Sequence, residues 1–136
     1  MSNVCPYDRF KEKTPVAWFE IVVKDWERSI HFYEQVFQVQ LKREGCADIQ
    51  MAIFPYQEGF PSGALSCGEC YVDCQPGAST TIVYLSAEGI EETLQRVDAE
   101  GGQRFLPCTD IGGGNGFIAL FKDLEGNVVG LWAPVA

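Results

Sequence analysis

The chain has 136 residues, of which 46% are hydrophobic, and carries a formal net charge of −9 at pH 7. This length supports one domain with a modest core, so we expect a single domain over residues 1–136 that is completed by a homodimer partner. Nucleic acid and anionic membranes attract stripes of Lys and Arg, which this acidic chain lacks, so neither is an expected partner. Residues 1–13 are polar and no later run approaches the length of a membrane span, so we expect a cytoplasmic protein.

The sequence contains two related halves. Residues 51–54 (MAIF) recur as residues 118–121 (IALF), and Glu58-Gly59 recurs as Glu125-Gly126, at an offset of 67. The fronts of the halves match at an offset of 64, where residues 18–23 correspond to residues 82–87 and the helical segment that begins at Trp26 corresponds to the one that begins at Ile90. Such a repeat predicts two fused modules, one over about 14–67 and one over about 79–134, with a loop over about 68–78.

The first module begins with a strand and a helix. Residues 18–23 alternate with the period of a strand, so one face holds Trp18, Glu20 and Val22 and the other holds Phe19, Ile21 and Val23. Residues 25–37 have the apolar period of a helix, with a stripe formed by Trp26, Ile30, Tyr33 and Phe37. We expect this stripe to cover the Phe19 face of the strand.

The second module repeats this order. Residues 82–87 predict a strand with Ile82, Tyr84 and Ser86 on one face and Val83, Leu85 and Ala87 on the other. Residues 90–100 predict a helix with a stripe of Ile90, Leu94 and Val97, ended by Gly101-Gly102. Further strands are predicted over residues 49–54, 63–67, 117–121 and 127–132.

Three of the six cysteines form a C-x2-C-x3-C cluster at Cys67, Cys70 and Cys74. A structural zinc ion would need a fourth ligand, and the one histidine, His31, is distant in sequence and falls on the outer face of its helix. The cysteines therefore have two interpretations. Reduced loop thiols are the favoured one, and a structural zinc site is the alternative.

Two glycine-containing segments predict connections between strands. Residues 111–116 (IGGGNG) are followed by a strand and carry no Lys-Ser or Lys-Thr, so they predict a hairpin connection, with a lid as the alternative, and not a phosphate loop. Residues 123–127 (DLEGN) predict a turn in which Gly126 supplies a positive φ. We expect no catalytic role for the two acids of this turn.

The order of these motifs resembles one protein superfamily. A strand followed by DWERSIxFY, then a Gly-Gly helix end, then IALFKDxEGN before a closing strand is similar to the vicinal oxygen chelate superfamily, over residues 16–134. Its members include glyoxalase I, bleomycin-resistance proteins and extradiol dioxygenases. The resemblance implies an α+β fold of two tandem βαβββ modules, with a cleft-shaped mixed β-sheet and helices on its outer face, usually completed in a homodimer.

The resemblance also implies where a metal would bind. Metal-using members hold their ion with His, Gln or Glu at four strand positions, which correspond here to Trp18, Gly63, Ile82 and Gly130. None of these residues offers a side-chain ligand to a divalent ion. We therefore expect the usual metal site to be absent, and we do not expect ordinary lactoylglutathione lyase or dioxygenase activity.

The remaining site hypothesis concerns the cleft. The residues expected to line it are Trp18, Glu20, Val22, Ile82, Tyr84 and Trp132. A carboxylate among apolar neighbours could exchange protons, so Glu20 is the candidate acid or base, and the aromatic side chains could stack on a ligand. Three functions stay open: binding of a small, partly apolar or aromatic molecule, a lyase or isomerase that uses Glu20 on a carbonyl compound, and a structural or partner-binding module.

Overall fold

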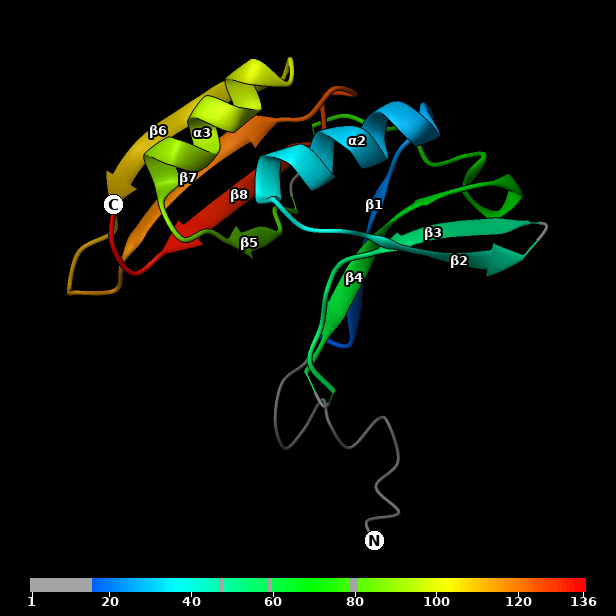
Figure 1. Cartoon of the computed structure of the whole chain (residues 1–136), viewed down its shortest axis with the longest axis horizontal. Helices are drawn as coiled ribbons and strands as arrows, with labels where there is room; N and C mark the ends of the chain where they lie inside the picture. Colours follow the sequence, from blue (N-terminus) through cyan, green and yellow to red (C-terminus); the bar gives the residue numbers. More distant parts are fainter. Residues whose placement is uncertain (1–15, 47, 59, 79–80) are drawn as a thin grey trace, which may run out of the picture.

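The computed structural model describes residues 16–46, 48–58, 60–78 and 81–136, so the polar first segment and Cys5 lie outside the described residues. The chain forms two βαβββ modules of an α+β fold, as the sequence predicts (Figure 1). The elements in chain order are β1 (Trp18–Val22), α2 (Trp26–Phe37), β2 (Lys42–Cys46), β3 (Ile49–Ile53), β4 (Ser62–Cys67), the short 3-10 helix η1 (Glu69–Tyr71), β5 (Tyr84–Ser86), α3 (Ile90–Ala99), β6 (Gln103–Asp110), β7 (Phe117–Lys122) and β8 (Val128–Ala133).

Each module forms a four-stranded mixed sheet. The strand orders are β1-β4-β3-β2 in the first module and β5-β8-β7-β6 in the second. The first strand of each module pairs in parallel with the last, and the other neighbours are antiparallel. This topology makes β1 and β5 edge strands, along which the two sheets approach each other.

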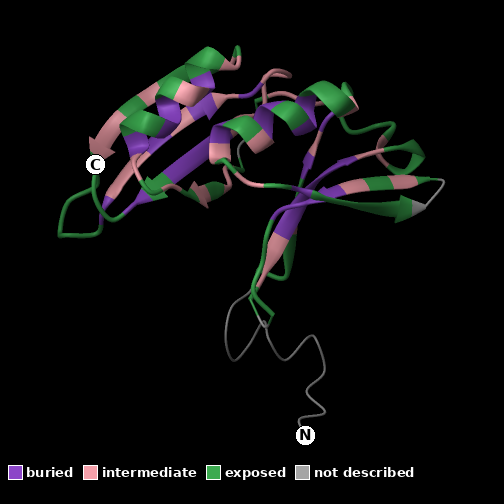
Figure 2. Cartoon of the chain, viewed as in Figure 1, coloured by how far each residue is buried: buried purple, intermediate pink, exposed green. Residues whose placement is uncertain are grey.

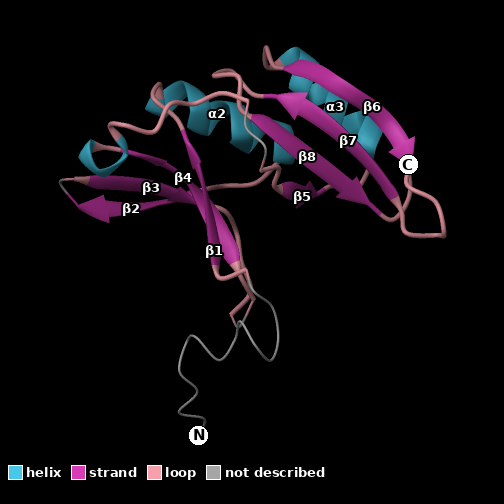
Figure 3. Cartoon of the chain, turned by 180° about the vertical axis from the view of Figure 1, so that it is seen from behind, coloured by secondary structure: helices cyan, strands magenta, loops and turns pink. Residues whose placement is uncertain are grey.

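Both helices lie on one side of the sheets (Figures 1 and 3). The helix stripes face the core: Ile30, Tyr33, Leu94 and Val97 are at most 2% exposed, and Trp26 and Phe37 are partly buried against them (Figure 2). These residues belong to one hydrophobic cluster that includes strand residues of both modules, so the modules share a core. None of the described helices is long and apolar enough to cross a membrane.

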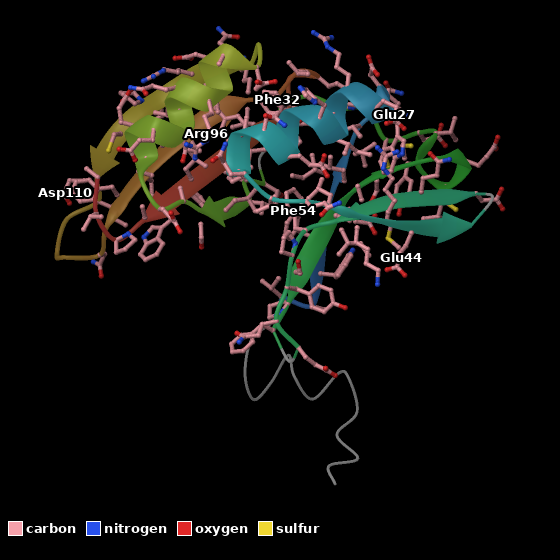
Figure 4. The ribbon with its side chains drawn as sticks, viewed as in Figure 1. Glu27, Phe32, Glu44, Phe54, Arg96 and Asp110 are labelled. Atoms are coloured by element: carbon pink, nitrogen blue, oxygen red, sulfur yellow. The ribbon has the colours of Figure 1, made fainter. Side chains whose placement is uncertain are left out.

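The contact between the helices ties the modules together. Arg96 Nε of α3 donates a hydrogen bond to the carbonyl oxygen of Val36 at 2.7 Å. Phe32 of α2 packs with its ring centroid 6.1 Å from that of Phe121 on β7, in the layer between α2 and the second sheet (Figure 4). A helix of the first module therefore packs on a strand of the second.

The strands β2 and β6 are not among those that the apolar pattern predicts. Their sequences, KREGC and QRFLPCTD, are polar or interrupted by proline. Both are outer edge strands, where charged side chains can stay in water. Pro107 has no backbone N–H, and on an edge strand this does not interrupt the hydrogen bonding inside a sheet. Arg43 pairs with Glu27 of α2 and Arg104 with Glu91 of α3, so each edge strand is tied to its own helix by an ion pair.

The predicted turn over residues 123–127 is present, with Gly126 at φ 84°, and its side chains join the modules. The carboxylate of Glu125 accepts hydrogen bonds from the backbone N–H groups of Lys24 and Asp25, both at 2.7 Å, and from Ser29 Oγ at 3.1 Å. These donors lie at the start of α2, so the carboxylate neutralises the positive end of this helix dipole.

Two other residues of this turn bond to the first module. Asp123 Oδ2 accepts a hydrogen bond from the buried hydroxyl of Tyr33 at 2.8 Å. Asn127 Nδ2 donates to the carbonyl oxygen of Val22 on β1 at 3.1 Å, and Asn127 Oδ1 accepts from the N–H of Gly77 at 2.9 Å. The acids of this turn thus have structural partners at α2, and Asn127 ties the turn that precedes β8 to β1.

Candidate ligand-binding site

The candidate site lies on the side of the sheets that faces away from the helices, which we name the open face. In the first sheet Glu20 is paired with Ala64 and Val22 with Ser66, and paired residues point to the same face. In the second sheet Tyr84 is paired with Gly130 and Ser86 with Trp132. The open face therefore includes Trp18, Glu20 and Val22 of β1, Ala64 and Ser66 of β4, Tyr84 and Ser86 of β5, and Gly130 and Trp132 of β8.

Three large aromatic side chains are exposed on the open face. Trp18 is 41% exposed, Tyr84 is 45% exposed and Trp132 is 38% exposed. Tyr84 and Trp132 lie on neighbouring strands of the same sheet, two ladder positions apart. Exposed aromatic side chains on one sheet face provide stacking surface for a flat or apolar molecule.

Trp132 is held in place by the glycine-containing loop. Its indole Nε1 donates a hydrogen bond to the carbonyl oxygen of Asn115 at 2.9 Å. The loop closes with a backbone hydrogen bond from Ile111 to Gly116 and connects β6 to β7, so the predicted hairpin connection is confirmed. The orientation of this indole is therefore set before any ligand arrives.

Tyr84 occupies the space over Gly130. A Cβ atom on Gly130 would lie 2.6 Å from Cε1 of the Tyr84 ring and closer still to Cδ1. The φ of Gly130 is not in the left-handed region, so the ring and not the backbone conformation requires a glycine. A glycine beneath a cross-strand aromatic ring is a known pairing in sheets, because the ring covers the exposed backbone.

The assignment of Gly63 as the counterpart of Gly130 is wrong. Ala52 pairs with Leu65 and Ala119 pairs with Leu131, so the offset between the last strands is 66, although it is 67 between β3 and β7. Gly63 pairs with Phe19, whose ring covers it on the core side of the sheet. The counterpart of Gly130 is Ala64, because a shift of one residue reverses the face of a strand.

The corrected positions also do not fit a divalent metal. Trp18, Ala64 and Gly130 carry no ligand atom, and Ile82, which precedes β5, is aliphatic. A metal ligand introduced at position 130 would also meet the ring of Tyr84. Within the described residues, no group of three or more His, Cys, Asp or Glu side chains is arranged to hold a metal ion.

This finding extends to the cysteine cluster, which the described structure does not bring together as a metal-binding group. Cys70 and Cys74 are exposed, and Cys67 is partly buried, with its Sγ 3.4 Å from Gln50 Oε1. Burial raises the pKa of the Cys67 thiol. A raised thiol pKa favours the protonated form of Cys67.

The alternation of β1 predicted that Glu20 would lie among apolar neighbours. In the structure Glu20 is exposed instead. The neighbouring carboxylate of Glu20, followed by desolvation, raises the pKa of the Tyr71 phenol. Glu20 and Ser66 share the open face by strand register, and Tyr71 lies near Glu20, so the three residues form a polar cluster.

Sequence reasoning missed two members of this cluster. Ser66 is fully buried, and its Oγ has no hydrogen-bond partner within the described part of the chain. The alternation of residues 62–67 could have placed Ser66 on the face of Glu20. Tyr71 had no such signal, because it belongs to η1 in the connection between the modules.

Two cavities lie where the sheets approach each other. One of about 230 Å³ is lined by Glu20 and Val22 of β1 and by Thr81, Val83 and Val128 of the second module. Another, of about 380 Å³, is lined by Phe19, Phe54 and Tyr84 among others. Of the residues expected to line a cleft, the structure places Glu20 and Val22 at the first cavity and Tyr84 at the second.

A family model described as the Glyoxalase/Bleomycin resistance protein/Dioxygenase superfamily matches residues 16–131, so the chain belongs to this superfamily. No curated protein sequence matches the chain. The similarity to individual proteins is therefore at the level of fold.

Solved structures with this fold include enzymes and binding proteins. Glyoxalase I from Zea mays is 21% identical with a TM-score of 0.66, over 87% of this chain and 45% of that one. TnmS3, an antibiotic binding protein from Streptomyces sp. CB03234, is 21% identical with a TM-score of 0.65, over 88% of this chain and 94% of that one. A superfamily member from Sphaerobacter thermophilus is 19% identical with a TM-score of 0.66, over 87% of this chain and 95% of that one. The chain spans about half the length of the maize enzyme.

Proposed function

We propose that this protein binds a small, partly aromatic molecule on its open face, without a metal ion. The observation that carries the proposal is the exposure of Trp18, Tyr84 and Trp132 on that face. Leaving three large aromatic rings partly in water forgoes the free energy of their burial, and a ligand that stacks on them recovers it.

The chemistry of the face supports binding over metal-assisted catalysis. Aromatic, aliphatic and small residues stand at the positions that the family resemblance assigns to metal ligands, and Tyr84 covers Gly130. Without these donors the face lacks the Lewis acid that stabilises an enediolate intermediate. An antibiotic binding protein shares the fold, so sequestration is a function that this fold can perform.

Two cavities adjoin the open face, one at Glu20 and Val22 and one at Tyr84, and neither is lined by Trp18 or Trp132. Their volumes, about 230 and 380 Å³, lie below or near the low end of pockets that enclose drug-sized molecules. We expect a ligand of one or two rings that lies along the approach of the two sheets.

The test is calorimetric titration with 2-naphthylmethanol, a neutral two-ring probe. Tyr84→Ala removes stacking surface, and we expect a loss of affinity of about tenfold or more, since truncation of an interfacial aromatic residue costs about 2 kcal/mol. The matched control is Tyr56→Ala, an exposed tyrosine in the connection between β3 and β4. Equal affinity in both variants, or no binding by the native protein, would contradict the proposal.

A second candidate function is a metal-independent lyase or isomerase. The proximity of Tyr71 to Glu20 favours it, because this pair could move a proton on a carbonyl compound bound at the open face. Glu20→Gln should then abolish turnover and retain ligand binding, and unchanged turnover would exclude this role. The third candidate, a structural module, predicts no cavity beside Trp18 and Glu20; a cavity adjoins Glu20 but not Trp18, so this candidate stays open.

We also propose that the protein acts as a homodimer. Exposed apolar side chains outside the aromatic site, such as Val16 and Phe60, would gain from a partner. Light scattering coupled to size-exclusion chromatography tests this, and a mass near 15.1 kDa at all concentrations would contradict it. The cytoplasmic location stays a prediction.

A further inference from the structure

Two cavities adjoin each other beside the C-terminal end of α2. One is the cavity of about 380 Å³ that Phe19, Phe54 and Tyr84 line. The other, also of about 380 Å³, lies between the end of α2 and α3 and is lined by Thr93 and Arg96 among others. The two cavities share three lining residues, which are Phe37, Val39 and Ser86. We name the two cavities together the helix-end groove.

One half of the helix-end groove is apolar, and core side chains hold its shape. The rings of Phe19 and Phe54 pack with their centroids 5.8 Å apart. The ring of Phe37 stacks on that of Tyr33 with an interplanar angle of 4°, and the Tyr33 hydroxyl is fixed by its hydrogen bond to Asp123. Because a preformed apolar cavity favours an apolar ligand group, this half suits a ring or a short hydrocarbon chain.

The other half contains a cation that the protein holds in place. Arg96 extends from α3 toward the end of α2 (Figure 4), where its Nε donates to the carbonyl oxygen of Val36 at 2.7 Å. Its Nη2 donates to Thr93 Oγ1 at 3.3 Å, and the buried Thr93 hydroxyl donates in turn to the carbonyl oxygen of Gly89 at 2.7 Å. A guanidinium group has five N–H donors, so this one is oriented and still has donors on Nη1 that bond to none of the described residues.

The charge of Arg96 is not balanced by a neighbouring acid. Arg43 and Arg104 form ion pairs with glutamates, whereas Arg96, which is partly buried, forms none within the described segments. Glu88 lines the same cavity, but its side chain is exposed and is not paired with Arg96. A partly buried guanidinium group with spare donors is a good partner for a carboxylate, which accepts two parallel hydrogen bonds from it.

We propose that the helix-end groove binds an amphipathic monocarboxylate. The apolar body of this molecule lies among the phenylalanine rings, and its carboxylate accepts hydrogen bonds from the guanidinium group of Arg96. Because the bonds to Val36 and Thr93 already orient this group, binding costs little side-chain entropy. The site goes beyond the proposed function, since neither Trp18 nor Trp132 lines it.

The test is calorimetric titration with two probes of similar shape, 4-phenylbutyrate, which is ionised at pH 7, and neutral 4-phenyl-1-butanol. Their flexible chain lets the ring and the polar end occupy different halves of the groove. We expect the native protein to bind the acid at least about tenfold more tightly, as for a charge-assisted hydrogen bond. Arg96→Gln should remove this preference and leave the affinity for the alcohol unchanged, which also shows that the variant is folded.

The matched control is Arg28→Gln. Arg28 is an exposed arginine on α2 that lines neither cavity, and the substitution changes the net charge by the same amount. This variant should keep the preference for the acid. A similar loss in both arginine variants would mean that only the overall charge matters, and would overturn the proposal. Equal binding of both probes by the native protein, or binding of neither, would also overturn it.

A third variant tests where the acid binds. Val39→Phe adds bulk where the two cavities meet, so we expect it to weaken the binding of 4-phenylbutyrate about tenfold or more. An unchanged affinity would place the acid outside the helix-end groove and would overturn the proposal. The proposed function is tested separately, because the indole signals of Trp18 and Trp132 should still respond to 2-naphthylmethanol in this variant.

Discussion

The ring of Tyr84 lies over Gly130, its partner in the parallel pairing of β5 with β8. The family resemblance assigns a metal-ligand position to Gly130, and here an aromatic ring fills that space. The same relationship recurs on the opposite side of the first sheet, where Phe19 covers Gly63. On the open face it turns a potential metal position into an aromatic surface.

We expect Gly130→Ala to destabilise the protein by about 1–3 kcal/mol, the usual cost of overpacking. The added Cβ would lie 2.6 Å from Cε1 of Tyr84, so the ring must move. Urea unfolding monitored by circular dichroism measures the change in the free energy of unfolding.

A double-mutant cycle controls this prediction. In the Tyr84→Ala background the ring is gone, so Gly130→Ala should cost much less than in the native background. Equal costs in the two backgrounds would show that backbone conformation, and not the ring, requires glycine at position 130.

Glu125→Gln should lower the free energy of unfolding by about 1–3 kcal/mol, because the carboxylate accepts charged hydrogen bonds at the start of α2. The matched control is Glu58→Gln, its exposed counterpart in the sequence repeat, which should change stability by less than about 0.5 kcal/mol. If both variants lose the same stability, the turn over residues 123–127 does not join the modules as described.

Stability should fall at alkaline pH because of Tyr33. Burial, followed by the charge of Asp123, raises the pKa of this phenol well above its ordinary value of 10.0. Above pH 10 the unfolded chain loses the Tyr33 proton before the folded protein does, so the folded state binds more protons. The free energy of unfolding therefore falls as the pH rises, by up to about 1.4 kcal/mol per pH unit. Below pH 10 the contribution is complete. Urea unfolding between pH 9 and 11.5 should show a shallower slope for Tyr33→Phe, and identical slopes would contradict this assignment.

Removal of metal ions should change neither stability nor ligand binding. The open face offers no set of ligands, and the described cysteines form no metal-binding group. Protein purified without chelator or affinity tag should contain no stoichiometric metal by mass spectrometry, before or after dialysis against EDTA. A stoichiometric metal that disappears in Cys67→Ser would indicate structural zinc, and one that remains would restore a metalloenzyme hypothesis.

The sequence predicts the parts of this fold where apolar residues recur with a period. The two faces of β1 and the apolar stripes of α2 and α3 were predictable because buried residues, such as Ile21, Ile30 and Leu94, recur with the period of a strand or a helix. The edge strands β2 and β6 have no such period, because both their sides are partly in water. The shifts in register near Leu106 further disturb the alternation of β6.

The site was less predictable because it depends on contacts between distant segments. A one-residue difference in the connection between antiparallel strands placed Gly63 on the core side, which no local pattern reveals. The alternation of β1 correctly gave the face of Glu20 but not its exposure, which depends on how the sheets approach each other. Tyr71, which lies near Glu20, belongs to η1 in the connection between the modules, and the sequence does not specify the path of this connection.

A titration of 15N-labelled protein with 2-naphthylmethanol, monitored through the three indole N–H signals, tests the aromatic ligand site most directly. We predict that the signals of Trp18 and Trp132 shift on saturable binding, while that of Trp26, which packs against the core, stays in place. Saturable binding that shifts Trp26 alone, or no shift of any indole signal, would contradict the claim that the open face is an aromatic ligand site.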